Sequence, residues 1–326
     1  IFAVRVTKRM RSSSGGSNST APSAPRPKKK KIGYVDEKAR DSIPLAERQF
    51  GPISRKEATR GPERQLWKIA DKAEMENMRA KCTFRNRRPS DAALLTRKRP
   101  TRCHMVRVRK RCGKRKSRLV ADGSSQKGLS KEEIYSPTPT ITSMRCQFVF
   151  MAQHGWFVRG CDVSQAFLLA KLDEPEPIRL PDEVLDEGED PIKIAEMALY
   201  GFKKSPKAWN KHSDKSFVAW GWTPLRKEGG VYAFYKEGEL VGLLVVYVDD
   251  IVVTAKHLSL AEETIANVVT EFGAERTKVT KTVQPDGSVL HKFDFIGVDV
   301  CMFFLQEALV KLRFDTSKRA KRILQK

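Results

Sequence analysis

Two adjacent carboxylates, Asp249 and Asp250, lie between two strongly apolar stretches of this 326-residue chain. The apolar runs at 240–247 and 251–255 are predicted strands, joined by a tight turn around the acidic pair. Burying an unpaired carboxylate costs free energy, and two side by side repel each other. The pair is therefore either a solvent-exposed hairpin tip, where Asp is a common turn residue, or part of a cation site. This stretch by itself favours neither interpretation.

A third carboxylate, Asp162, stands at the end of another predicted strand, at 156–163. If the three carboxylates converge on neighbouring strand ends, they form an oxygen-rich site of the kind that Mg²⁺ prefers, usually shared with substrate phosphates. Two such ions, about 3.5–4 Å apart, can activate an attacking hydroxyl and stabilise a departing pyrophosphate. The third carboxylate therefore shifts the balance from an exposed turn toward a metal site.

Helices and strands are interleaved from Leu119 onward. Helices are predicted over 142–154, 205–220 and 259–272, and each ends at a glycine, namely Gly155, Gly221 and Gly273. Ser259 and Glu262 have the spacing of a capping box. A turn at 285–287 separates two further strands, the second of which carries 293–300. Because adjacent strands are linked as hairpins, the pattern favours an α+β fold with an antiparallel sheet over a doubly wound parallel sheet.

The N-terminal part has a different composition. Residues 11–31 are Ser, Gly, Pro and Lys with almost nothing to bury, so we expect residues 1–45 to form a disordered, basic tail. A helix is predicted over 62–80, and its spacing places one set of apolar residues near one face: Leu66, Ile69, Ala70 and Met75.

Positive charge is concentrated in one block. The chain has a formal net charge of +23, and residues 79–118 hold 17 Lys and Arg against one acid, Asp91. Such a block attracts polyanions through charge neutralisation and counterion release. A solvated basic loop or a targeting patch is the simpler interpretation, but the block adjoins a segment with its own chemistry, which favours nucleic acid as the partner.

Six motifs in order resemble the reverse transcriptases of copia-type LTR retrotransposons. Residues 247–250 (YVDD) look like the catalytic hairpin of that family, and Asp162 with Ala166 and Phe167 resembles its first catalytic motif. The other four resemblances are 199–209 (LYGFKKSPKAW) to LYGLKQAPRAW, 116–123 (KSRLVADG) to KARLVAKG, 135–137 with 142–145 to YSPV…SIR, and 295–300 (FIGVDV) to FLGIEV. Their order and spacing hold over about three quarters of the chain, from 60 to 305.

The resemblance implies roles for individual residues. Asp162, Asp249 and Asp250 would be the catalytic residues and would hold two Mg²⁺ ions, with Mn²⁺ as a substitute. The implied deoxynucleotide-binding residues are Phe167, Tyr200, Gly201, Lys116 and Arg118, of which Phe167 would exclude a 2′-hydroxyl and either cation could contact the triphosphate. Taken without the family, Phe167 is a core aromatic and Tyr200 an ordinary strand-to-loop tyrosine. Template and primer would lie against Tyr247, Lys203, Arg107, Arg109, Lys110 and Arg111.

The resemblance also implies a right-hand polymerase fold. Its parts would be a tail (1–45), an N-terminal helix and basic fingers region (46–135), a palm and fingers with the carboxylates (136–275), and a primer-side hairpin with a truncated thumb (276–326). The implied activity is RNA-directed DNA polymerisation, a nucleotidyl transfer to a primer 3′-hydroxyl on an RNA or DNA template. The integrase and ribonuclease H regions that normally accompany it are absent from these residues, and the oligomeric state is open.

Two other functions compete with this one. The first is a truncated or decayed remnant that binds nucleic acid without catalysis, and the second is an unrelated metal-dependent phosphotransferase with acidic strand ends. The apolar runs are shorter than the roughly 20 residues of a transmembrane helix, so no membrane partner is expected. Six irregularly spaced cysteines do not form a disulfide scaffold, and we expect a reducing, intracellular location in the cytoplasm or nucleus.

Overall fold

The structure is a computed structural model that describes residues 51–110, 113–296, 298–305 and 308–315. The predicted disordered tail over 1–45 and the predicted nucleic-acid contact at Arg111 lie outside these residues. No described helix combines the length and apolarity needed to cross a membrane.

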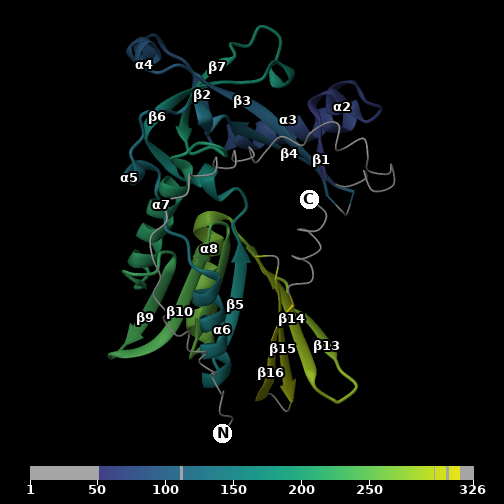
Figure 1. The fold of residues 1–326 in the computed structure, drawn as a ribbon, viewed down its shortest axis with the longest axis vertical. Coiled ribbons are helices and arrows are strands. Elements are labelled where there is room, and N and C mark those ends of the chain that lie inside the picture. The colour runs from purple at the N-terminus through teal and green to yellow at the C-terminus, as the bar shows by residue number, and fades with distance from the viewer. Residues whose placement is uncertain (1–50, 111–112, 297, 306–307, 316–326) are drawn as a thin grey trace, which may run out of the picture. The chain divides into compact units, whose positions relative to one another are not determined.

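The first sheet has the strand order β1-β3-β6-β7-β2, with β4 paired to β3. Its strands are β1 (Gly51–Ile53), β2 (Phe84–Asn86), β3 (Thr101–Arg109), β4 (Arg115–Ala121), β6 (Lys171–Arg179) and β7 (Ile192–Met197). All of its pairs are antiparallel except β3 with β6, where Thr101 lies opposite Ile178. Its helical neighbours are α2 (Arg55–Arg60), α3 (Arg64–Ala80) and α4 (Ala92–Arg97), and α3 packs against β4 (Figure 1).

The second sheet is antiparallel throughout and has the order β12-β5-β11-β10-β9-β8. Its strands are β5 (Phe157–Asp162), β8 (Thr223–Pro224), β9 (Val231–Lys236), β10 (Glu239–Tyr247), β11 (Asp250–Ala255) and β12 (Glu275–Arg276). Helix α8 (Leu258–Phe272) packs with Ile251 and Val253 of β11, whereas α6 (Ile141–His154) packs with Val252 between them. Because successive side chains of a strand point to opposite faces, the two helices cover opposite faces, which explains the continuous apolar runs.

The third sheet is drawn in yellow in Figure 1 and is formed by the last described strands, in the order β13-β14-β15-β16. Its strands are β13 (Thr280–Val283), β14 (Val289–Phe295), β15 (Val298–Leu305) and β16 (Ala308–Asp315). It packs on α6, where the Phe148 ring lies 6.0 Å from that of Phe293 and 5.9 Å from that of Phe295, centroid to centroid. The predicted turn at 285–287 is present, but the predicted single strand over 293–300 is divided between β14 and β15.

The remaining helices complete the described chain. Helix α7 (Ser205–Ala219) packs against β6, and α5 (Lys131–Ile134) packs against α7. The 3₁₀ helices are η2 (Pro89–Asp91), η3 (Gly123–Ser125), η4 (Ala166–Leu169) and η5 (Asp182–Val184). The three predicted helices are therefore present, but the predicted capping box is wrong. Helix α6 begins one residue before the predicted start and is capped by Thr140. Helix α8 begins before Ser259, and Glu262 pairs with Arg159 and Arg276 instead of closing a capping box.

The predicted apolar face of α3 is right in part. Met75 is buried and Ala70 packs against the cluster around Trp67, but Leu66 is 44% exposed and Ile69 is 65% exposed, so neither of these two belongs to the buried face. The buried face of this helix is formed by Trp67, Asp71, Glu74, Met75 and Met78. Hydrophobic spacing missed it because two of its members are acidic, and acids are normally counted as solvent-facing.

A buried ion pair joins α3 to the first sheet. The Arg107 side chain is 1% exposed and donates to Asp71 through Nε at 2.9 Å and Nη2 at 2.7 Å. Ser117 Oγ of β4 donates to the same carboxylate at 2.6 Å, and Glu183 lies 3.5 Å from the guanidinium. The carboxylate of Asp71 thus connects α3, β3 and β4.

This ion pair gives a prediction for stability. Arg107→Leu is expected to lower the free energy of unfolding by about 3–5 kcal/mol, because it leaves the Asp71 carboxylate buried without its cation. Urea denaturation measures the change, with Arg99→Leu, an exposed arginine of the same basic block, as the control. The double variant Arg107→Leu/Asp71→Leu removes both charges and should recover most of the loss. A double variant as unstable as the single one would contradict the assignment.

Candidate active site

The three predicted carboxylates meet at one edge of the second sheet. Asp162 ends β5, Asp250 begins β11, and the two are directly opposite each other in the antiparallel register. The backbone N–H of Val163 donates to the carbonyl of Asp249 at 2.7 Å, which holds the turn residue against the same strand end. Directly opposed residues in an antiparallel pair have their side chains on the same face, so Asp162 and Asp250 are neighbours.

The turn between β10 and β11 holds its residues in an unusual conformation. Tyr247 pairs with Asp250, which leaves Val248 and Asp249 as a two-residue loop. Val248 has a φ of +59°, in the left-handed region that a β-branched residue rarely adopts. Such a conformation costs about 1–3 kcal/mol and persists only when its surroundings enforce it. The Nε1–H of Trp209 on α7 donates to the Val248 carbonyl at 2.7 Å and supplies one such restraint.

The charges at this edge repel one another. Burial, and then the charges of Asp249, Asp162 and Asp294, raise the pKa of Asp250 to about 7. Partial burial and then Asp249 also raise the pKa of Asp162, against the opposing effect of Lys116 and Lys110. The site therefore favours the protonated form of Asp162 and Asp250, because a proton removes the negative charge that burial and the neighbouring carboxylates oppose.

Two further acids at this edge were not predicted. Glu275 of β12 lies opposite Asp162 in the register, on the side away from Asp250, and Asp294 of β14 acts electrostatically on Asp250. Neither follows a recognisable motif, and their proximity results from strand pairing alone. Within the described ranges, no group of three or more His, Cys, Asp or Glu side chains is placed so that it could hold a metal ion.

Three of the predicted nucleotide-binding side chains lie together. The Phe167 and Tyr200 rings meet edge to face with centroids 5.5 Å apart, and Arg118 Cζ lies 5.1 Å from the centroid of the Tyr200 ring. Burial raises the pKa of the Tyr200 hydroxyl to about 12, so this group stays neutral. Lys116 lies two residues before Arg118 on β4 and therefore on the same face of that strand. Burial and then the charge of Arg118 lower the Lys116 pKa.

Glycine is required at position 201 because the backbone of β4 approaches it closely. Its φ is +89°, and a Cβ atom there would lie 2.0 Å from the Ala121 carbonyl oxygen at the end of β4. The Ala121 N–H donates to the Tyr200 carbonyl at 2.7 Å. The segment that carries Tyr200 is thus fixed directly on the strand that carries Arg118.

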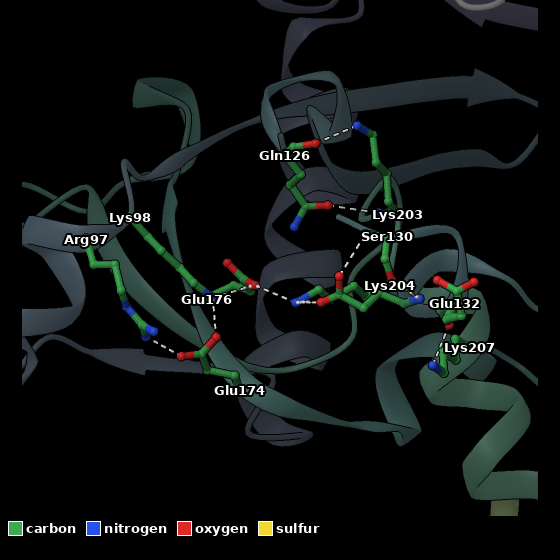
Figure 2. Close-up of polar contacts among 11 residues, drawn as sticks. Arg97, Lys98, Gln126, Ser130, Glu132, Glu174, Glu176, Lys203, Lys204 and Lys207 are labelled. Carbon is green, nitrogen blue, oxygen red and sulfur yellow. Dashed lines mark hydrogen bonds and ion pairs between the residues drawn. The ribbon is translucent and has the colours of Figure 1, made fainter. Parts of the chain in front are cut away.

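Lysines that follow this segment hold a neighbouring loop (Figure 2). Lys203 Nζ donates to the Gln126 carbonyl at 2.5 Å, and Lys207 Nζ donates to the Glu132 carbonyl at 2.5 Å. Lys204 lies between Glu133 and Glu176, at 3.6 and 3.8 Å. Lys203 remains exposed, but its ammonium already binds within the chain, so its predicted contact with nucleic acid stays a prediction.

The remaining predicted nucleic-acid contacts differ in their exposure. Arg107 was predicted to contact nucleic acid, and this is wrong because its guanidinium is buried against Asp71. Arg109 pairs with Glu63 at 2.5 Å and shares this carboxylate with Arg115, whereas Lys110 is exposed. Tyr247 is half-buried and lines a cavity of about 60 Å³ with Phe295 and Ile296.

Three polar side chains near Phe167 also escaped the sequence analysis. Gln165 lies two residues before Phe167, and Glu74 and Asn77 of α3 bond to its side-chain amide. Gln165 lies within a recognised motif, but no local pattern in 64–80 indicates that this helix reaches it.

Comparison with known proteins agrees with this arrangement. The model of the family described as reverse transcriptase (RNA-dependent DNA polymerase) matches residues 96–282. The retrovirus-related Pol polyprotein from transposon RE1 of Arabidopsis thaliana is 29% identical over 163 residues, which cover 49% of this chain and 11% of that protein. The one from transposon TNT 1-94 of Nicotiana tabacum is 29% identical over 218 residues, which cover 64% and 16%.

The chain therefore spans less than a fifth of either relative. The family match covers more than half of the chain and includes the strand ends that carry Asp162, Asp249 and Asp250. On this evidence of motif order, strand pairing and similarity, the chain belongs to the reverse transcriptase (RNA-dependent DNA polymerase) family, in its copia-type branch.

Proposed function

We propose that this chain is an RNA-directed DNA polymerase domain that joins deoxynucleotides to the 3′-hydroxyl of a primer. The observation that carries the proposal is the register of β5 with β11, which sets Asp162 opposite Asp250 beside the turn at Asp249. A site of this kind needs little covalent chemistry from the protein, because positioning and charge stabilisation do most of the work in phosphoryl transfer.

The carboxylates fit a divalent cation. Their oxygen-only donor set suits Mg²⁺, and the pKa values of Asp162 and Asp250 are raised by burial and then by the neighbouring carboxylates, two effects that a bound cation would offset. Mg²⁺ is usually held by one or two carboxylates with substrate phosphates completing the shell, so a ready-made group of three ligands is not required. Asp162, Asp249 and Asp250 would hold it, with Mn²⁺ as a substitute. When bound, the metal would activate the primer hydroxyl and neutralise the triphosphate.

The chain's own side chains would position the nucleotide. Arg118, stacked on Tyr200, presents a guanidinium suited to a triphosphate oxygen. The charge of Lys116 lowers the pKa of Asp162, so its ammonium group lies close enough to the carboxylates to stabilise their negative charge. Phe167, against the Tyr200 ring, would lie under the sugar and exclude a 2′-hydroxyl.

We extend the proposal to a right-hand architecture. The tail would be 1–45, the fingers 46–135, the palm with part of the fingers 136–275, and the primer-side hairpin with the start of a thumb 276–326. The first sheet carries the basic strands β3 and β4, the second carries the carboxylates, and the third packs on α6, which supports this division. Template and primer would contact exposed residues such as Lys110.

A non-catalytic nucleic-acid-binding remnant is the weaker proposal. It relies on the basic block, yet Arg107 is compensated by Asp71, and Arg109 and Arg115 share the single carboxylate of Glu63. Part of the block's charge is thus used inside the fold, which leaves the carboxylate site as the better-supported function.

The first test is catalytic. Asp162→Asn and Asp249→Asn are each expected to abolish Mg²⁺-dependent incorporation of deoxynucleotides on a primed homopolymer RNA, because each removes a charge that the metal needs. Primer extension with and without Mg²⁺ measures this, with circular dichroism to show that the variants remain folded. Asp173→Asn, which removes an exposed carboxylate paired with Lys211, should leave incorporation unchanged. Polymerisation by either site variant would defeat the proposal.

The second test uses pH in metal-free protein. The pKa of Asp250 is about 7 in the folded state against an ordinary value of 3.8, so the folded protein binds more protons and loses stability as the pH rises between these values. Asp250→Asn removes this loss. The variant should match the wild type near pH 4 and be more stable at pH 8, as measured by urea denaturation. About three pKa units correspond to about 4 kcal/mol, and solvent screening of the partly exposed side chain reduces the expected difference to about 2 kcal/mol. Parallel stability curves for the two proteins would be the contrary result.

A further inference from the structure

Gln165 is fixed by an unusual set of restraints. Its φ is +60°, a left-handed conformation, and its carbonyl accepts the N–H of Leu168 as η4 begins. Asn77 Nδ2 donates to Gln165 Oε1 at 2.5 Å, and Gln165 Nε2 donates to Glu74 Oε2 at 3.0 Å. Because both ends of the amide are engaged by side chains one helical turn apart on α3, the amide has a single favoured orientation.

The helix that supplies these partners is itself held firmly. The carboxylate of Asp71, one turn before Glu74, is buried against Arg107, and the neighbouring Met75 and Met78 belong to the main core. Glu74 is 7% exposed, and burial raises its pKa against the opposing effects of a hydrogen bond with the Leu119 backbone and the charges of Arg118 and Lys116. A buried carboxyl group needs such partners, and these hold Glu74 against β4, from where it accepts the Gln165 amide.

The position of Phe167 depends on how Gln165 is held. This residue lies in η4, whose first turn begins from the restrained Gln165, and its ring packs against Tyr200. A displacement of Gln165 would shift the start of η4 and with it the ring. Discrimination between substrates that differ by one hydroxyl depends on small distances in the pocket, so such a shift should alter it.

We propose that Glu74 and Asn77 are positioning residues that hold Gln165 and thereby set the place of Phe167, and so the selectivity for deoxyribo- over ribonucleotides. The inference rests on the proposed function. It assigns this role to α3, which precedes the matched family region at 96–282. The side chains of α3 contact Gln165, the residue from which η4 and its Phe167 begin.

The test compares kcat and KM for dATP and ATP on a poly(rU) template with an oligo(dA) primer, using the full chain. Asn77→Ala should lower the ratio of kcat/KM values, dATP over ATP, by about tenfold, mainly through better use of ATP. Glu74→Gln keeps an acceptor for Gln165 Nε2 and should preserve the ratio, whereas Glu74→Leu should lower it. Gln65→Ala, an exposed amide on the same helix, is the matched control.

A purely structural role would give a different pattern. If Asn77→Ala left the ratio unchanged, or reduced dATP and ATP use by the same factor, the positioning role would be overturned. If the wild-type chain incorporated neither nucleotide, the proposed function and the role in selectivity would fail together, and amide hydrogen exchange would still test the restraint on Gln165. Exchange over residues 164–169 should be faster in Asn77→Ala than in Gln65→Ala, and equal rates would overturn the proposed restraint.

Discussion

Repulsion among carboxylates at neighbouring strand ends is the constraint around which the site is built. Asp162 and Asp250 are opposed in the register, Asp249 lies in the adjoining turn, and Glu275 extends the acidic row to a third strand. Like charges directly opposite one another destabilise a sheet, so the pairing must be enforced from elsewhere. The enforcement comes from α6 and α8, which cover both faces of the sheet, and from Trp209, which holds the strained turn.

In the first sheet, opposite charges attract and join the strands to helix α3. The basic block that dominates the sequence supplies Arg107 to Asp71 and both Arg109 and Arg115 to Glu63. An exposed ion pair contributes little to stability, but a buried carboxylate such as Asp71 cannot be left unpaired without a large penalty. Helix α3 is thus attached to its sheet as much by matched charges as by apolar contacts.

The sequence predicted what local patterns encode. The hairpin at 240–255 and the three helices, predicted at 142–154, 205–220 and 259–272 and observed at 141–154, 205–219 and 258–272, follow from apolar periodicity and turn residues. The register of β5 with β11, in contrast, joins residues far apart in the chain. The sequence-based prediction failed where contacts between residues far apart in the chain determine which side chains are buried. Leu66 and Ile69 had the right spacing for a buried face, but the partner of α3 is a basic strand, so Asp71 and Glu74 are buried instead. Nothing local marks Arg107 as the arginine that, among the described members of its block, lies in the interior.

The same reasoning explains why the site extends beyond its recognisable motifs. A motif such as the one at 162–167 fixes residue types and their order, but the orientation of a side chain depends on what packs behind it. At Gln165 that support comes from α3, whose own position is set by Asp71 and Arg107. The buried ion pair of Asp71 with Arg107 and the cluster of Phe167, Tyr200 and Arg118 are therefore parts of one connected structure, joined by a helix that lies outside the recognised motifs.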